Sequence, residues 1–273
     1  MNRFQRSFAL LSESLAVVRA DRSLLLFPVL SAVFTVLAMI IILVPGFAFV
    51  AGGGESRSLP FLVLSLLAGY AATVIATYFN VALVSCAAQY FHGEQTSINT
   101  GLGAANRRLG AILVWGLIAT VVGAILRALE ERAGFLGSIV VGLLGAGWTV
   151  ATYFVIPVLA FEQVGPGDAL RRSVATVRRS WGESLIGNVG LGIATFVLMI
   201  PVFFTGLAAF AVMNTVPAFG VLLLVVAGAA MIALVVVTSA LSQVYKTAVY
   251  LFAANGEVVG FSRDLLDGAF RSK

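Results

Sequence analysis

The sequence has no charged residue between Glu183 and Lys246. The hydrocarbon core of a bilayer is about 30 Å thick, and a helix crosses it with about 20 apolar residues. Residues 184–245 are therefore too many for one crossing and must turn. Asn214-Thr215-Val216-Pro217 contains turn-forming residues near the middle of this stretch, and it predicts a break between two membrane-spanning helices.

The rest of the chain repeats this apolar character. Apolar residues make up 60% of the 273 residues, charged residues make up 11%, and the mean hydropathy is +1.04. Soluble domains carry about 25% charged residues, so this chain could not cover a water-exposed surface of normal polarity. The sequence predicts an all-α polytopic membrane protein that forms a single integral membrane domain over residues 1–273. The six predicted spans are 24–50, 60–91, 109–129, 135–161, 184–212 and 218–245.

Basic residues are distributed unevenly between the two sides of these spans. Fourteen of the 17 Lys and Arg residues fall in the N-terminal segment, in 92–108, in 162–183 or in the C-terminal segment. Cytoplasmic loops of membrane proteins carry an excess of Lys and Arg. This count predicts cytoplasmic N- and C-termini, and we expect the location to be a bacterial plasma (inner) membrane.

Each of these basic segments also contains an amphipathic stretch with apolar residues spaced by 4, 3 and 4 positions, as in Ile98, Leu102, Ala105 and Leu109. This spacing places the apolar residues on one face of a helix. It predicts interfacial helices at 3–19, 97–108, 168–181 and 256–270. Thr-Tyr-Phe occurs in the second and fourth spans, which favours a threefold repeat of interfacial helix, span and span. Alternatively, these helices are ordinary basic linkers that pack on the spans.

Arginine side chains on the predicted interfacial helices are candidates for binding anionic lipid headgroups, because they lie beside apolar spans. The same position argues against nucleic acid as a partner, although the net charge is +5. Membrane lipids are the expected partners. The candidate headgroup ligands are Arg107, Arg108, Arg171, Arg172, Arg178, Arg179 and Arg263.

Residues that would support catalysis are scarce. Cys86 and His92 are the sole cysteine and histidine, and His92 with Glu94 offers too few ligands for a metal. The glycines at 187–192 and 101–103 do not fit a dinucleotide-binding loop. We therefore expect no enzyme activity, no cofactor and no metal. An enzyme acting on lipid would need Glu162, Asp168, His92 or the arginines to converge on one pocket.

Small residues recur every four positions in the fourth span, at Gly134, Ser138, Gly142 and Ala146. Such stripes allow membrane helices to approach closely. The pattern predicts packing within the bundle or an interface with a protein partner or a second copy of the chain.

Polar residues within the spans are candidates for a transport pathway, chiefly Asn188, Gln243 and Lys246. Transporters often build such sites where spanning helices are broken, and Pro157 and Pro201 could interrupt the fourth and fifth spans. Interhelical hydrogen bonds explain the same polar residues equally well.

Two segments resemble a known group of proteins. In the first, Arg19-Ala20-Asp21-Arg22 leads into Leu25-Leu26-Phe27-Pro28; the second runs from Phe161 through Ala169-Leu170-Arg171-Arg172-Ser173 to Trp181. Both resemble an uncharacterised group of bacterial six-helix membrane proteins. That group is similar to the membrane domain attached to some glycerophosphodiester phosphodiesterases. The resemblance implies a fold and a location, and the catalytic domain of those enzymes has no counterpart in this sequence.

The sequence as a whole favours a non-catalytic integral membrane protein, either an accessory or scaffold subunit or a lipid-organising protein. The alternative is a transporter or channel for a neutral or amphiphilic solute. No pattern in the sequence identifies a solute, a partner or an oligomeric state.

Overall fold

The structure is a computed structural model that describes residues 12, 14–52, 59–179 and 181–255. Its described residues form helices and turns, without a strand. Two compact units divide the chain: residues 1–25 with 180–273, and residues 26–179. They are called unit 1 and unit 2 below. The prediction of a single membrane domain over 1–273 stays a prediction.

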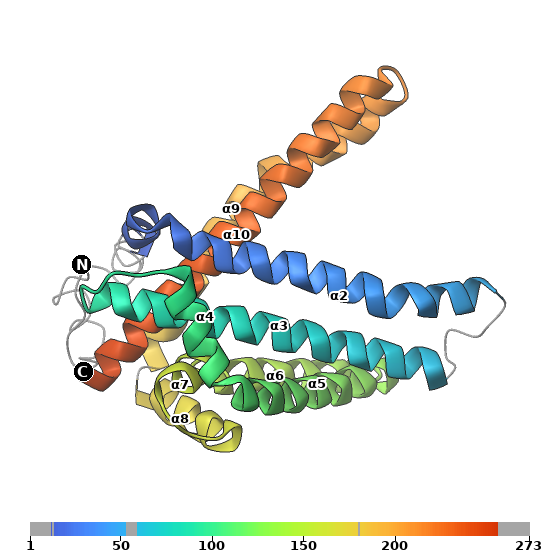
Figure 1. Cartoon of the computed structure of the whole chain (residues 1–273). Helices are drawn as coiled ribbons and strands as arrows, with labels where there is room; N and C mark the ends of the chain where they lie inside the picture. The colour runs from blue at the N-terminus through green and yellow to red at the C-terminus, as the bar shows by residue number, and fades with distance from the viewer. Residues whose placement is uncertain (1–11, 13, 53–58, 180, 256–273) are drawn as a thin grey trace. The chain divides into compact units, whose positions relative to one another are not determined.

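Unit 2 is built around one long helix. Helix α3 (Leu59–Phe91) contacts α2 (Leu26–Ala51), α4 (Ile98–Arg107), α5 (Leu109–Arg132) and α7 (Val155–Phe161). Helices α6 (Phe135–Ala151) and α8 (Pro166–Arg179) complete the unit. The short helices α4, α7 and α8 lie at the end where α3 finishes and α5 begins (Figure 1).

Unit 1 contains a helical hairpin. Helix α9 (Trp181–Met213) packs along α10 (Pro217–Asn255), and residues 214–216 form the predicted turn between them. A Cβ atom on Gly220 would lie 2.8 Å from Cα of Met213, so glycine permits the close approach of the two helices beside the turn. The 3-10 helix η1 (Arg22–Leu25) contacts α10, and Leu24 in it is fully buried.

Six helical segments in the described part of the chain are long and apolar enough to cross a membrane. Their large apolar side chains are widely exposed in the outer parts of α2, α3, α5, α6, α9 and α10. In water such exposure would be strongly unfavourable, whereas lipid chains solvate these side chains. The prediction of six membrane-spanning helices is therefore confirmed at the level of length and composition. The six segments are Arg22–Ala51, Leu59–Phe91, Leu109–Arg132, Leu136–Phe161, Gly190–Met213 and Pro217–Ala253.

The fourth span is interrupted close to Pro157, as the sequence predicted. Residues 152–154 form turns that separate α6 from α7, and Pro157 lies in the first turn of α7, where a proline is tolerated. In contrast, α9 runs without a break through Pro201. The expectation that Pro201 interrupts the fifth span is therefore wrong.

Two of the predicted interfacial segments are short helices, since α4 and α8 cover most of 97–108 and 168–181. The segment 256–270 and most of 3–19 lie outside the described residues. The position of these helices at the membrane interface and the threefold repeat both stay predictions.

Candidate functional site

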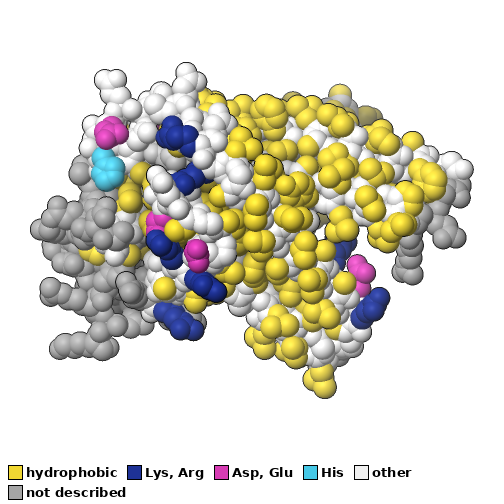
Figure 2. Space-filling view, turned by 60° about the horizontal axis from the view of Figure 1, so that its bottom comes forward, with side chains coloured by type: hydrophobic (Ala, Val, Ile, Leu, Met, Phe, Trp, Pro, Cys, Tyr) yellow, Lys and Arg dark blue, Asp and Glu magenta, His cyan; other side chains and the backbone are white. Residues whose placement is uncertain are grey.

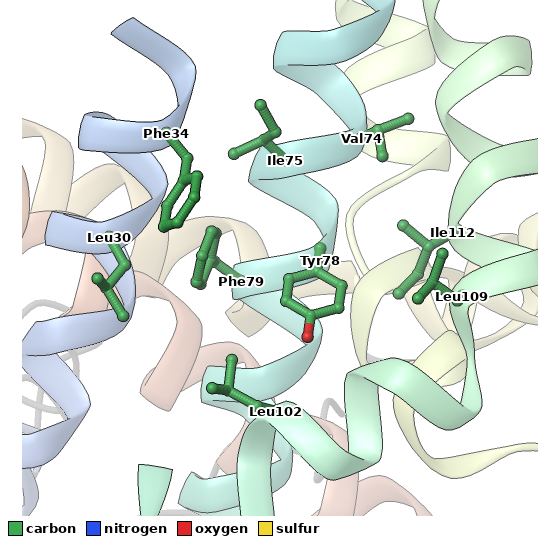
Figure 3. Close-up of a pocket in the computed structure, with 9 residues that line it drawn as sticks. All are labelled: Leu30, Phe34, Val74, Ile75, Tyr78, Phe79, Leu102, Leu109 and Ile112. Carbon is green, nitrogen blue, oxygen red and sulfur yellow. The ribbon is translucent and has the colours of Figure 1, made fainter. Parts of the chain in front are cut away.

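A lateral pocket opens on the face of α3 between α2 and α5, with α4 at its base (Figure 3). Its volume is about 380 Å³, which lies within the usual range of about 300–1,000 Å³ for ligand pockets. Eight of the nine lining residues are aliphatic or phenylalanine, and the ninth is Tyr78. The nine lining residues are Leu30, Phe34, Val74, Ile75, Tyr78, Phe79, Leu102, Leu109 and Ile112.

Aromatic contacts fix the wall of this pocket on the α2 side. The rings of Phe34 and Phe79 lie 5.7 Å apart, and the ring of Phe79 meets that of Tyr78 edge-to-face at 5.3 Å. Phe79 is buried, while Phe34 is half exposed. The wall is therefore buried at Phe79 on α3 and exposed at Phe34 on α2, so the pocket opens laterally.

Tyr78 supplies the polar end of the pocket. Its hydroxyl donates a hydrogen bond to Oδ1 of Asn106 on α4, over 2.8 Å. Arg107 and Arg108 directly follow Asn106 in the sequence. Neither arginine forms an ion pair with any residue in the described part of the chain. The apolar pocket thus contains one hydroxyl, which is bonded to the residue that directly precedes two arginines in the sequence.

Helix α4, which forms the base of the pocket, is held by its N-terminal cap. The hydroxyl of Ser97 accepts from the Thr100 amide, and the Thr100 hydroxyl accepts from the Ser97 amide. The Thr100 hydroxyl also donates to Oε1 of Gln89 on α3. These bonds satisfy amides that the first turn of a helix leaves without partners.

Gly101 lets α4 lie directly on α3. A Cβ atom at this position would lie 2.6 Å from Sγ of Cys86 and 2.8 Å from the carbonyl oxygen of Ala82. It would also lie 2.9 Å from Cζ of Phe27 on α2. Glycine is therefore the residue that fits at position 101, where α4 packs against α3 and α2.

The other candidate arginines lie on α8. Arg172 forms an ion pair with Glu162 at the end of α7, and Arg171 lies 3.8 Å from Asp168 on an exposed surface. Arg178 is exposed. The side chain of Arg179 and all of Arg263 lie outside the described residues. On the face shown in Figure 2, Lys and Arg side chains gather beside one end of a broad hydrophobic area.

The residues considered for catalysis do not form a common site. His92 is exposed in the turn after α3, and Glu162 pairs with Arg172. No cluster of three or more His, Cys, Asp or Glu side chains that could hold a metal occurs among the described residues.

The small-residue stripe of the fourth span is exposed at all four positions. Gly134 is the N-cap of α6, and Ser138, Gly142 and Ala146 lie within that helix. A Cβ atom on Gly142 would meet no atom within 4 Å. Packing within unit 2 therefore does not account for the stripe.

The three candidate pathway residues lie in unit 1. Gln243 is buried on α10 with 8% exposure, and its Oε1 atom has no hydrogen-bond partner among the described residues. Lys246 is half-buried on the same helix. Asn188 lies on α9, and its side chain is outside the part that the structure describes.

These features define an all-helical membrane protein with a lateral apolar pocket beside the middle of α3, the central helix of unit 2. Residues 58–261 match a family of unknown function, DUF6159, and the chain belongs to this family. No curated protein and no solved structure matched the chain in a search.

Sequence reasoning did not find the pocket. Its apolar residues have the same character as those that face lipid, so composition could not separate the two groups. One signal was present in the sequence: Tyr78 lies within an apolar span, and Asn106, its partner, directly precedes the arginine pair.

Proposed function

We propose that this protein is a non-catalytic integral membrane protein that binds and organises lipid. The observation that carries the proposal is the apolar pocket whose single hydroxyl, on Tyr78, is bonded to Asn106, the residue that directly precedes Arg107 and Arg108 at the end of α4. An acyl chain fits the apolar part, and an anionic headgroup fits the basic end. Within this proposal, the resemblance to the membrane domain of some glycerophosphodiester phosphodiesterases supports only the membrane location.

The orientation follows from the charge distribution. We place both termini in the cytoplasm of a bacterium, with α4 and α8 at the inner surface of the plasma membrane. The arginines that follow Asn106 then meet the cytoplasmic leaflet. Each basic residue near an anionic surface contributes about 1 kcal/mol to binding. Each buried CH₂ group of an acyl chain contributes about 0.8 kcal/mol.

The test measures lipid retained by the full-length protein in nanodiscs that contain phosphatidylglycerol and phosphatidylethanolamine, using native mass spectrometry. Replacing both arginines, Arg107→Gln with Arg108→Gln, is expected to lower the preference for phosphatidylglycerol by about tenfold or more, since about 2 kcal/mol is lost. Filling the pocket with Ile75→Trp is expected to lower the amount of retained lipid of both kinds.

The matched control is Arg127→Gln, which removes a basic side chain at the opposite end of α5, where Arg127 pairs with Glu131 at 3.5 Å. It is expected to leave retained lipid unchanged. An unchanged lipid preference in the Arg107 and Arg108 double variant, or full retention in Ile75→Trp, would refute the proposal.

An accessory-subunit role is a compatible form of the proposal, supported by the exposed small residues of α6. A pull-down of the tagged full-length protein in mild detergent, with mass spectrometry of proteins and lipids, tests it. A stoichiometric partner protein that is lost in Gly142→Leu supports the role. Recovery of the protein with lipid alone contradicts it.

The alternative is transport of a neutral or amphiphilic solute, and it rests on the buried acceptor of Gln243. Carboxamide groups inside a membrane mark sites of hydrogen bonding to partners or solutes. Uptake into vesicles that contain the purified protein, and its loss in Gln243→Leu, would support transport. Equal leakage in vesicles with and without the protein would count against it.

A further inference from the structure

A second hollow lies between α3 and α5, farther along both helices. It has a volume of about 590 Å³ and is lined by α3 from Val63 to Tyr70 and by α5 from Leu117 to Ala128. All of these residues belong to unit 2. Leu66, Leu117 and Ile125 at its edge are each at least half exposed, so the hollow opens sideways.

A close helix contact separates this hollow from the first pocket. A Cβ atom on Gly116 would lie 2.5 Å from Cγ2 of Val74 and 3.5 Å from the ring of Tyr70. Val74 lines the first pocket, and Tyr70 lines the second hollow. The contact of Gly116 with α3 therefore lies between the two cavities and separates them.

The length of the second hollow matches half of a bilayer. Eleven residue steps along α5, from Leu117 to Ala128, correspond to about 16 Å at a rise of about 1.5 Å per residue. One leaflet contributes about half of the 30 Å hydrocarbon core. The hollow's lining on α3 starts at Val63, one turn after Leu59, where α3 begins. Its lining on α5 finishes at Ala128, one turn before Arg132, where α5 ends. It therefore covers the leaflet opposite to that of α4.

The hollow has no hydroxyl that is available to a polar guest. The Tyr70 hydroxyl donates to the carbonyl oxygen of Leu113 at 3.4 Å, and the Thr120 hydroxyl donates to the Thr73 hydroxyl at 3.5 Å. The Thr73 hydroxyl in turn donates to the carbonyl oxygen of Gly69. Since these groups bond within the protein, the surface offered to a guest is apolar, and an acyl chain is the guest that fits it.

The charges beyond the hollow indicate the headgroup. The end of α5 carries Arg127, Glu130, Glu131 and Arg132, an equal number of basic and acidic residues. Arg127 and Glu131 form an ion pair. This end offers no net attraction to an anionic headgroup, in contrast to the unpaired Arg107 and Arg108 beside the first pocket.

We propose that the second hollow binds an acyl chain of a zwitterionic lipid from the leaflet opposite to that of α4. Gly116 separates this site from the first pocket, so each site fills independently. The inference does not depend on occupancy of the first pocket.

The experiment uses the full-length protein in vesicles of phosphatidylethanolamine and phosphatidylglycerol. The probe is a phosphatidylethanolamine with a photoreactive diazirine on its acyl chain, and labelled peptides are mapped by mass spectrometry. The proposal predicts labelling at residues 117–128 above that at 136–147 of α6, whose surface is equally apolar. Replacing the probe by its phosphatidylglycerol counterpart is expected to give no increase at 117–128.

The test variant is Ala124→Trp, which fills the hollow and is expected to reduce labelling at 117–128 to the level of α6. The control variant is Leu143→Trp, which adds similar bulk on α6, where Leu143 is 68% exposed. It is expected to leave the labelling at 117–128 intact. If Ala124→Trp does not elute as a single species, competition of the probe with unlabelled phosphatidylethanolamine in the wild type replaces it and must reduce the same labelling.

Equal labelling of α5 and α6 in the wild type would overturn the proposal, because it would show ordinary surrounding lipid. Labelling at 117–128 that rises with the anionic probe would overturn the headgroup assignment. A cross-link from 117–128 to another polypeptide in place of lipid would show a protein helix as the occupant. With the phosphatidylglycerol probe, absence of labelling at residues 102–112 would contradict the function proposed for the first pocket, while labelling of 117–128 by the phosphatidylethanolamine probe would still support this site.

Discussion

Individual glycines in this chain have different roles that their sequence context does not reveal. Gly101 on α4 lies against α3 and α2, where a Cβ atom would meet three atoms at less than 3.0 Å. Gly103, two residues later, has its nearest neighbour at 3.7 Å, on the flexible side chain of Arg107. The sequence presents these two glycines as one motif, but the packing distinguishes them.

We therefore expect Gly101→Ala to destabilise the protein by about 1–3 kcal/mol, the usual cost of overpacking a tight site. Gly103→Ala is the control and is expected to be neutral or slightly stabilising, because alanine favours helix. Thermal unfolding of both variants in the same detergent measures the difference. Equal melting temperatures for the two variants would contradict the packing role of Gly101.

At the scale of elements, the six spans were predictable because membrane-crossing length and apolar composition leave few alternatives. A break in the fourth span was predicted from Pro157, but its position at residues 152–154 was not. Thr-Tyr-Phe is continuous helix at 77–79 but forms turns at 152–154. The same three residues therefore adopt two structures. Pro157, four residues after Tyr153, disfavours a continuous helix at the second site only, and a partner distant in sequence also bonds the backbone there.

That partner is Ser173 on α8. Its hydroxyl donates to the carbonyl oxygen of Ala151 at 2.7 Å and accepts from the amide of Phe154 at 3.0 Å. Ser173 is fully buried, so water does not compete for these two groups. One side chain from α8 thus satisfies the backbone on both sides of the break.

Ser173→Ala is expected to destabilise the protein by about 1–3 kcal/mol, because two buried backbone groups lose their partner. Hydrogen exchange at the Phe154 amide is expected to accelerate in this variant. Thr149→Ala is the control, since the Thr149 hydroxyl bonds the carbonyl of Gly145 on an exposed part of the same span. An unchanged exchange rate at Phe154 would show that Ser173 is not the partner that protects this amide.

Glu162→Gln tests the second link between α7 and α8. The ion pair of Glu162 with Arg172 joins the two helices, whereas the pair of Asp168 with Arg171 lies within α8 and is exposed. We expect Glu162→Gln to lower the melting temperature more than Asp168→Asn does, because exposed pairs contribute about 0–1 kcal/mol. Identical melting temperatures would indicate that the pair adds nothing beyond the hydrogen bonds of Ser173.

At the scale of the whole molecule, the proposed orientation rests on fourteen of 17 basic residues on one side of the spans. A reporter that fluoresces in the cytoplasm, fused after Lys273, is expected to be active. The same reporter inserted after Thr215, in the turn between α9 and α10, is expected to be inactive. The reverse pattern would invert the topology and move the first pocket to the outer leaflet.

Of the candidate site, the sequence predicted only the basic residues Arg107 and Arg108. Arg107 and Arg108 were identified because they lie on a predicted interfacial helix beside an apolar span. The pocket itself depends on how α2, α4 and α5 surround α3, and local sequence does not encode those distances. The two-unit division of the chain depends in the same way on contacts between distant segments.

The hydrogen bonds of Ser173 also have a consequence for biosynthesis. The fourth span leaves the ribosome before α8, which follows it in the chain. Until residue 173 has been translated, the carbonyl of Ala151 and the amide of Phe154 lack the partner that they have in the finished protein. Unsatisfied backbone groups cost several kcal/mol each in hydrocarbon. We therefore expect the fourth span to complete its insertion only after α8 emerges, and truncation before residue 173 to leave this span poorly inserted.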